Sequence, residues 1–200
     1  MVVLVITDPN MAAVHGYLCA DGYVIRNPPE QKHKYYYIGL RGKNLTMLKD
    51  FQQRFETVFG IRPILIEGER CKIQNKAIYE RLVKEFKSFY SWEWSMPEMS
   101  AKALRAWLRA YFDCEGWVEV QPGKSRTVRA ECVNERGIGQ VRAALLKLGI
   151  RSESKKRSDR AIFRLNICGK DDLLKFRELV GFLHPDKAAK LDAAIASFRS

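Results

Sequence analysis

Two acidic residues stand at matching places in two similar stretches of the sequence. Asp21 lies in GYLCADGYV (residues 16–24), and Glu115 lies in AYFDCEGWV (residues 110–118), 94 positions later. Carboxylates at helix C-termini face the negative end of the helix dipole, and two of them close together repel each other. A bound cation would stabilise such a pair. Oxygen ligands without histidine or thiolate favour Mg²⁺, and divalent ions on a basic protein can hydrolyse a phosphodiester.

The helices expected before the two acids carry small side chains along one side, at intervals of four residues. These residues are Ala12, Gly16 and Ala20 and, 94 positions later, Ala106, Ala110 and Cys114. Two helices with such ridges can pack closely along an i±4 row. Close packing would bring their C-terminal acids together. Gly22 and Gly116 are expected to end the two helices in the left-handed conformation.

The offset of 94 extends to the elements that follow each acid. Each acid precedes a hairpin of β-branched and aromatic residues, a helix, a second pair of strands and a third helix. The sequence therefore predicts an α+β fold of two tandem αββαββα repeats related by a pseudo-twofold axis. The expected division is an N-terminal half (1–90), a linker (91–99) and a C-terminal half (100–200), with a last helix at 184–200.

The charge of the chain points to a polyanionic partner. It holds 35 Lys and Arg against 23 Asp and Glu, a net charge of +12, and nucleic acid is the commonest partner of so basic a chain. The cations gather in the hairpins, and a two-stranded ribbon can enter the major groove of DNA. For each single cation, a solvated surface charge remains the alternative. The residues expected to contact DNA are Arg26, Lys32, Lys34, Tyr35, Tyr37, Arg41, Lys43, Lys124, Arg126, Arg129, Lys155 and Arg157.

The cysteine pattern and the hydropathy of the sequence indicate the cellular location to expect. Five cysteines and three histidines are scattered without zinc-site spacing, so reduced thiols in an intracellular protein are expected. The sequence shows neither a cleavable signal nor an apolar run of about 18 residues, and no membrane partner is expected. The cytoplasm of a prokaryote or archaeon is the expected location, with an organelle as the alternative.

The segments VHGYLCADG (residues 14–22) and LRAYFDCEG (residues 108–116) resemble two degenerate copies of the LAGLIDADG motif. Over its whole length the chain resembles the monomeric, two-motif LAGLIDADG homing endonucleases. The resemblance implies a saddle of antiparallel sheets and cleavage of double-stranded DNA. It also implies a monomer that acts on a long, nearly non-palindromic site and leaves short 3′ overhangs.

The resemblance also assigns roles around the acids. It implies that Asp21 and Glu115 bind divalent metal with the carbonyls of Ala20 and Cys114, and that Lys72 supports the nearby water network. Mg²⁺ is the expected metal, with Mn²⁺ able to replace it and Ca²⁺ supporting binding without cleavage. In the second half the position matching Lys72 is Asn166, and either Arg126 or Arg129 is a candidate to take over its role.

Three alternatives remain beside an active homing nuclease: a binding protein with the same fold, another class of nuclease, and acids without a function. A maturase for intron RNA or a DNA-binding regulator could use the same fold without cleavage, although both acids are present. The triplet Tyr37–Gly39 echoes the GIY-YIG nucleases, and the acids could be mere capping-region charges. Members of the family often lie inside inteins. Because the sequence has no intein splicing residues at its ends, a free-standing, intron-encoded enzyme is expected.

Overall fold

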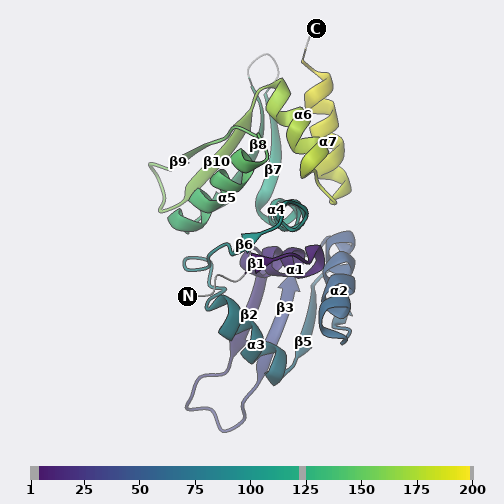
Figure 1. Cartoon of the computed structure of the whole chain (residues 1–200), viewed down its shortest axis with the longest axis vertical. Coiled ribbons are helices and arrows are strands. Elements are labelled where there is room, and N and C mark those ends of the chain that lie inside the picture. Colours follow the sequence, from purple (N-terminus) through teal and green to yellow (C-terminus); the bar gives the residue numbers. More distant parts are fainter. Residues whose placement is uncertain (1–4, 122–124, 199–200) are drawn as a thin grey trace.

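The computed structural model describes residues 5–121 and 125–198, which build two four-stranded antiparallel sheets on either side of a central helix pair (Figure 1). The first half contains α1 (Pro9–Cys19), β2 (Gly22–Arg26), β3 (Tyr36–Arg41), α2 (Leu45–Phe59), β4 (Ile64–Ile66), β5 (Arg70–Gln74) and α3 (Lys76–Phe86). The second half contains α4 (Ala101–Glu115), β7 (Gly116–Gln121), β8 (Ser125–Cys132), α5 (Glu135–Lys147), β9 (Glu153–Lys156), β10 (Phe163–Cys168), α6 (Lys170–Leu179) and α7 (Pro185–Ala196).

The two sheets have the same strand arrangement, which confirms the predicted repeat. The orders are β2-β3-β5-β4 and β7-β8-β10-β9, so in each half the first hairpin lies beside the last strand of the second pair. Two further strands, β1 (Val5–Ile6) and β6 (Glu98–Met99), pair in parallel. They tie the segment before α1 to the segment before α4.

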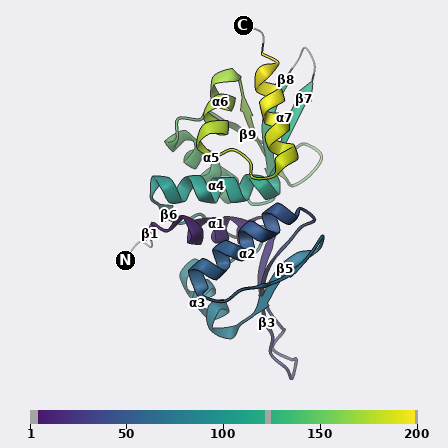
Figure 2. The ribbon, with the colours of Figure 1, turned by 90° about the vertical axis from the view of Figure 1, so that its right-hand side faces the viewer.

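The helices α1 and α4 lie side by side at the centre of the molecule, with one sheet above and one below (Figures 1 and 2). Small side chains allow this approach, as predicted. A Cβ atom added at Gly16 would lie 2.7 Å from the carbonyl oxygen of Trp107 and 3.2 Å from the Cβ of Ala110. The backbones of the two helices are therefore nearly in contact at this point.

The expectation of left-handed glycines after these helices is wrong. Gly116 has φ −88°, and Gly22 is not among the glycines with positive φ. Both glycines instead relieve crowding where the chain turns directly from helix into strand. An added Cβ would lie 2.4 Å from the Cα of Leu18 at Gly22, and 2.6 Å from the carbonyl oxygen of Phe112 at Gly116.

A buried histidine joins the central helices. His15 of α1 is 1% exposed, and its Nδ1 accepts a 2.8 Å hydrogen bond from the indole of Trp107 on α4. Trp107 stacks on Tyr111 at 5.2 Å between ring centroids, and Trp94 packs against both rings. An unpaired buried polar group is costly, so this hydrogen bond favours one register of α1 against α4.

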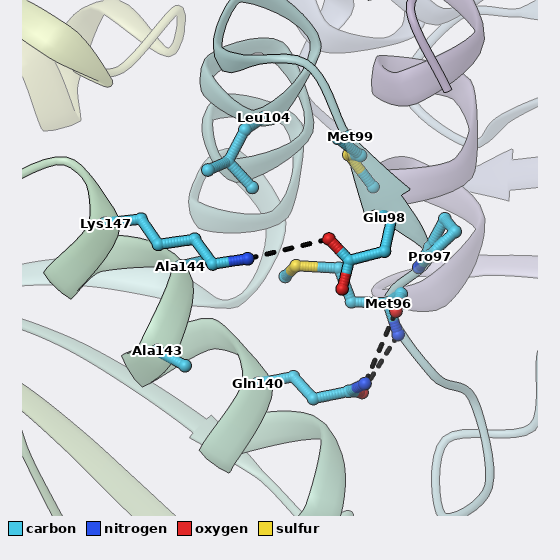
Figure 3. A pocket seen from close by; sticks show the side chains of 9 residues that line it. All are labelled: Met96, Pro97, Glu98, Met99, Leu104, Gln140, Ala143, Ala144 and Lys147. Atoms are coloured by element: carbon cyan, nitrogen blue, oxygen red, sulfur yellow. Dashed lines mark hydrogen bonds and ion pairs between the residues drawn. The ribbon is translucent and has the colours of Figure 1, made fainter. Parts of the chain in front are cut away.

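The segment before α4 is fastened to the second half (Figure 3). The backbone N–H of Met96 donates to the side-chain oxygen of Gln140 at 2.9 Å, and the Gln140 amide donates back to the Met96 carbonyl at 3.3 Å. Lys147 forms an ion pair with Glu98 at 3.6 Å. The hollow between these segments has a volume of only about 140 Å³, so it is a small gap between packed segments.

Among residues 5–121 and 125–198, no helix combines the length and apolarity that a membrane crossing requires.

Candidate active site and nucleic-acid interface

Asp21 and Glu115 meet where α1 and α4 end. Asp21 connects α1 to β2, and Glu115 is the last residue of α4. Burial, followed by the charge of Asp21, raises the pKa of Glu115 to about 7. Desolvation by neighbouring atoms also raises the pKa of Asp21, opposed by a hydrogen bond with Cys114 and by the charge of Lys187. The folded chain thus disfavours two negative charges here, which is the situation that a bound cation relieves.

Lys187, in the first turn of α7, brings a cation to this pair of acids. Its ammonium donates to the carbonyl of Asp113 at 2.6 Å and to the carbonyl of Cys114 at 3.3 Å. Desolvation lowers the pKa of Lys187, while the charges of Asp21 and Glu115 are among those that oppose the fall. One ammonium therefore stands among the C-terminal carbonyls of α4, beside both carboxylates.

Asp113 positions Lys187. The buried carboxylate of Asp113 accepts hydrogen bonds from the backbone N–H groups of Leu183 at 2.9 Å and His184 at 3.0 Å. Burial raises the pKa of Asp113 to about 6, although these hydrogen bonds oppose the rise. The loop before α7 is thereby fixed to the end of α4. The matching residue of the first half is the buried Cys19, whose sulfur lies 3.5 Å from Nδ1 of His15.

The repeat could not have revealed Lys187, because the offset of 94 places Glu93 at the matching position. Glu93 is exposed and accepts a 2.7 Å hydrogen bond from the hydroxyl of Ser88. The one sequence signal was a lysine in the first turn of the last helix, just after Pro185. A cation there faces the positive end of the helix dipole, so it needs carbonyl or carboxylate partners from elsewhere.

The arrangement fits a hard divalent cation with few protein ligands. No group of three His, Cys, Asp or Glu side chains that could hold a metal occurs within residues 5–121 and 125–198. A metal at this site would therefore use Asp21, Glu115, neighbouring carbonyls such as those of Ala20 and Cys114, and non-protein oxygens. Mg²⁺ suits such a site, because it usually keeps several waters and takes only one or two carboxylates.

The expected basic supports of the site lie on different strands. Lys72 lies on β5, half-buried, opposite Gly39 of β3. Asn166 lies on β10 opposite Arg129 of β8, and Arg129 forms an ion pair with Glu119. The guanidinium of Arg126 donates to the hydroxyl and carbonyl of Ser197, both at 2.7 Å. Both arginines that were candidates to replace a lysine at position 166 thus have other partners.

In the first half, most of the expected DNA contacts are exposed. Lys34 is nonetheless tied into its loop, because its ammonium donates to the carbonyl of Gln31 at 2.6 Å. Tyr35 stacks on the partly buried Tyr37 at 5.8 Å between centroids, and Arg41 lies over the ring of Tyr23. The exposed residues of the set are Arg26, Lys32, Lys34, Tyr35, Arg41 and Lys43.

In the second half, three of the expected cations, Arg129, Lys155 and Arg157, are paired with acids. Arg157 donates to Glu131 at 3.0 Å and to Asp159 at 2.6 Å, and Lys155 lies 3.7 Å from Glu153. Lys124 falls outside the described residues. A hollow of about 480 Å³ opens over this part of the sheet, and its lining adds two cations that were not predicted, Lys156 and Arg164.

Comparison with known proteins identifies a family model for part of the chain and a shared fold for most of it. Residues 102–181 match the family model of the LAGLIDADG-like domain. A replication factor C small subunit of Thermococcus kodakarensis is 34% identical over 94 residues, which make up 46% of this chain and 10% of that protein. A DNA polymerase of the same organism is 28% identical over 203 residues, or 90% of this chain and 12% of that protein. The chain thus spans about a tenth of the length of these two relatives.

Solved structures match over both halves. The structure of I-DmoI with DNA and Ca has a TM-score of 0.66 and 16% identity, and the match covers 92% of this chain and 97% of that one. The structure of the homing endonuclease I-WcaI bound to its DNA recognition sequence has a TM-score of 0.62 and 15% identity, with 92% and 85% covered. The chain therefore contains a LAGLIDADG-like domain at residues 102–181 and has, over both halves, the fold of the homing endonucleases I-DmoI and I-WcaI.

Proposed function

We propose that this chain is a site-specific endonuclease that cleaves both strands of a DNA duplex by metal-dependent hydrolysis. The observation that carries the proposal is the meeting of Asp21 and Glu115 at the adjacent ends of α1 and α4, with Lys187 beside them. The sheets on either side carry the exposed cations that a DNA backbone requires. The DNA-bound homing endonucleases of the same fold support this proposal.

Each residue of the site has a task in this proposal. Asp21 and Glu115, with the carbonyls of Ala20 and Cys114, would hold Mg²⁺, with Mn²⁺ able to replace it and Ca²⁺ supporting binding only. A metal held by these groups would supply Lewis-acid chemistry, by lowering the pKa of a water and stabilising the leaving oxygen. Lys187 places a positive charge where negative charge develops on the phosphate.

Lys72 and the hairpin cations complete the proposal. Lys72 orders water near the acids from β5, while the basic hairpin residues hold the duplex along the two sheets. A single chain supplies both acids, so a monomer suffices for a long site without exact twofold symmetry. These assignments rest on the placement of the residues and on the shared fold.

The similar proteins suggest how the gene segment for this chain is carried. The segment aligned with this chain makes up 12% of the DNA polymerase of Thermococcus kodakarensis. It makes up 17% of a glutamine–fructose-6-phosphate aminotransferase of Methanocaldococcus jannaschii. Proteins of unrelated activity thus hold a similar segment, which supports a transferable module. A free-standing, intron-encoded enzyme stays a prediction.

The test is cleavage of a randomised duplex library with Mg²⁺ by the wild type, Asp21→Asn and Glu115→Gln. We expect the wild type to select and cut one long sequence, and each variant to bind that sequence without a double-strand break. Glu178→Gln, which removes an exposed carboxylate on α6, is the control and should cut normally. If the wild type cuts no sequence but binds an intron RNA or one operator, the maturase or regulator alternative replaces this proposal.

A further inference from the structure

A separate hollow of about 440 Å³ lies between the end of β2, the helix α3 and the segment that follows α3. Arg26, at the far end of β2 from Asp21, lines it together with Lys87. Three aromatic residues, Tyr79, Phe89 and Tyr90, are also among the residues that line it. Among residues 5–121 and 125–198, no acidic residue lines this hollow, so Arg26 and Lys87 meet no carboxylate in its described lining. Its volume falls in the range of small-ligand pockets.

A strained turn builds one wall of the hollow. Lys87 has φ 70° and ψ −73°, and it is the one residue other than glycine with positive φ in the described part of the chain. The backbone N–H of Ser88 donates to the carbonyl of Phe86 at 2.9 Å, which makes this a classic-type γ-turn, a rare conformation. The turn ends α3 abruptly and directs the chain back toward β2. Such strain persists only where the surroundings enforce it.

Two large rings are displayed beside the turn. Tyr90 is 53% exposed and Trp92 is 65% exposed, and their rings stack at 5.0 Å with an interplanar angle of 9°. The carbonyl of Tyr90 accepts hydrogen bonds from the N–H groups of Glu93 at 2.9 Å and Trp94 at 3.1 Å. Because Trp94 is only 1% exposed, this short turn is anchored in the core. The exposed rings are thus held in place by a fixed backbone.

This combination fits a planar ring attached to an anion. A ring stacked on Tyr90 would extend the Tyr90–Trp92 stack, and a nearby phosphate would meet Arg26 and Lys87. Bases of single strands are free to stack on aromatic side chains, whereas bases of a duplex are already stacked on one another. Lys87 also has a purely structural partner, since its ammonium donates to the carbonyl of Lys84 at 3.1 Å. That hydrogen bond gives the Lys87 side chain a structural role. It does not explain why Arg26 lines the hollow or why the rings of Tyr90 and Trp92 are exposed.

We propose that this hollow binds an unpaired nucleotide of a single-stranded nucleic acid, with the base stacked on Tyr90 and its phosphate at Arg26 and Lys87. The proposal adds a second nucleic-acid site, which shares Arg26 with the expected duplex contacts. It does not depend on duplex cleavage by the paired acids. The 2′-hydroxyl distinguishes RNA from DNA, so comparison of the two identifies the source of the nucleotide.

The test uses the full chain in EDTA and fluorescently labelled 12-nucleotide single strands of RNA and of DNA, with anisotropy as the readout. We expect Tyr90→Ala and Trp92→Ala to weaken binding of at least one of the two strands about tenfold, as for loss of a stacked base. Ile64→Ala, which truncates an equally exposed side chain at 65% on β4, should bind like the wild type. Circular dichroism checks that each variant is folded.

Two results would overturn the proposal. One is equal affinity of the wild type and Tyr90→Ala for both strands. The other is loss of single-strand binding in Ile64→Ala as severe as in Tyr90→Ala. Duplex binding and cleavage by Tyr90→Ala, measured separately with Mg²⁺, should match the wild type. Failure of the second site and failure of the proposed nuclease therefore give different results.

Discussion

At the residue scale, the side chain of Lys187 brings a positive charge to the two acids. Its ammonium binds carbonyls at the end of α4 and offsets part of the charge of the two acids. Asp113, a positioning residue, holds the loop that carries it. The first half offers only Glu93 at the matching position, so the two halves are chemically unequal although their folds correspond.

Lys187→Met should lower the rate of DNA cleavage by about 100-fold, as for loss of one charge-stabilising donor. Duplex affinity should change little, because the sheets provide most of the phosphate contacts. Single-turnover cleavage and a separate binding titration in Ca²⁺ measure the two quantities. Lys190→Met, which removes an exposed cation from the same helix, is the control. Equal rates in the two variants would show that Lys187 acts only as general charge.

His15 should make stability depend on pH. Burial lowers the pKa of His15 to about 3, below its value of about 6.5 in an unfolded chain. The unfolded state therefore binds a proton that the folded state does not below pH 6.5. Its contribution is fully present above pH 6.5 and is lost as the pH falls from 6.5 toward 3, with a slope approaching about 1.4 kcal/mol per pH unit.

His15→Gln removes this titration and keeps an acceptor for the indole of Trp107. The difference in unfolding free energy between the wild type and the variant should shift in favour of the variant as the pH falls from 7 to 4.5. Urea denaturation at several pH values measures it, and the other titrating groups cancel in the comparison. A difference that stays constant with pH would mean that His15 has the same pKa in the folded and the unfolded protein.

At the scale of elements, the helix pair α1–α4 determines where the acids lie. Gly16→Ala should destabilise the chain by about 1–3 kcal/mol, because the new methyl group would press on the backbone of Trp107. Gly139→Ala in α5, where an added Cβ meets nothing within 4 Å, should instead stabilise it by about 0.5–1 kcal/mol. Thermal unfolding of Gly16→Ala and Gly139→Ala tests these two expectations. Stabilisation by both would mean that the helices are farther apart than described.

The repeat made the order of elements and the meeting of the acids predictable from sequence. The order follows from the repeat itself, and the meeting of the acids follows from the small residues that recur at matched positions in both helices. Lys187 was missed because the described part of the first half has no helix that corresponds to α7. The partners of Arg126 and Arg157 were also missed, because they depend on how distant segments lie side by side. The glycines after the acids were recognised, but the crowding that requires them is visible only in three dimensions.

At the scale of the whole molecule, the net charge of +12 predicts a steep salt dependence of duplex binding. Each phosphate that a cation neutralises releases a condensed counterion. Affinity should fall on the order of 10³-fold between 50 and 200 mM salt if about six phosphates are contacted. Binding titrations in Ca²⁺ at several salt concentrations give the slope. A slope near zero would exclude the sheets as the phosphate-binding surface.

The acids on the second sheet reduce this electrostatic attraction. Glu131 accepts hydrogen bonds from both Arg157 and Arg164, which lowers the pKa of Glu131 although partial burial acts in the other direction. Glu131→Gln should release the guanidinium group of Arg164 toward the phosphates and remove one of the two acid partners of Arg157, which keeps its ion pair with Asp159. We therefore expect tighter duplex binding, a steeper salt slope and weaker discrimination between the target and unrelated DNA, because the added attraction ignores sequence.

Glu178→Gln on α6 makes the same change of net charge among the helices and is the control. If both variants bind alike, net charge alone governs affinity. If only Glu131→Gln binds more tightly, the pairing of arginines with acids on this sheet limits how strongly the protein holds DNA in general.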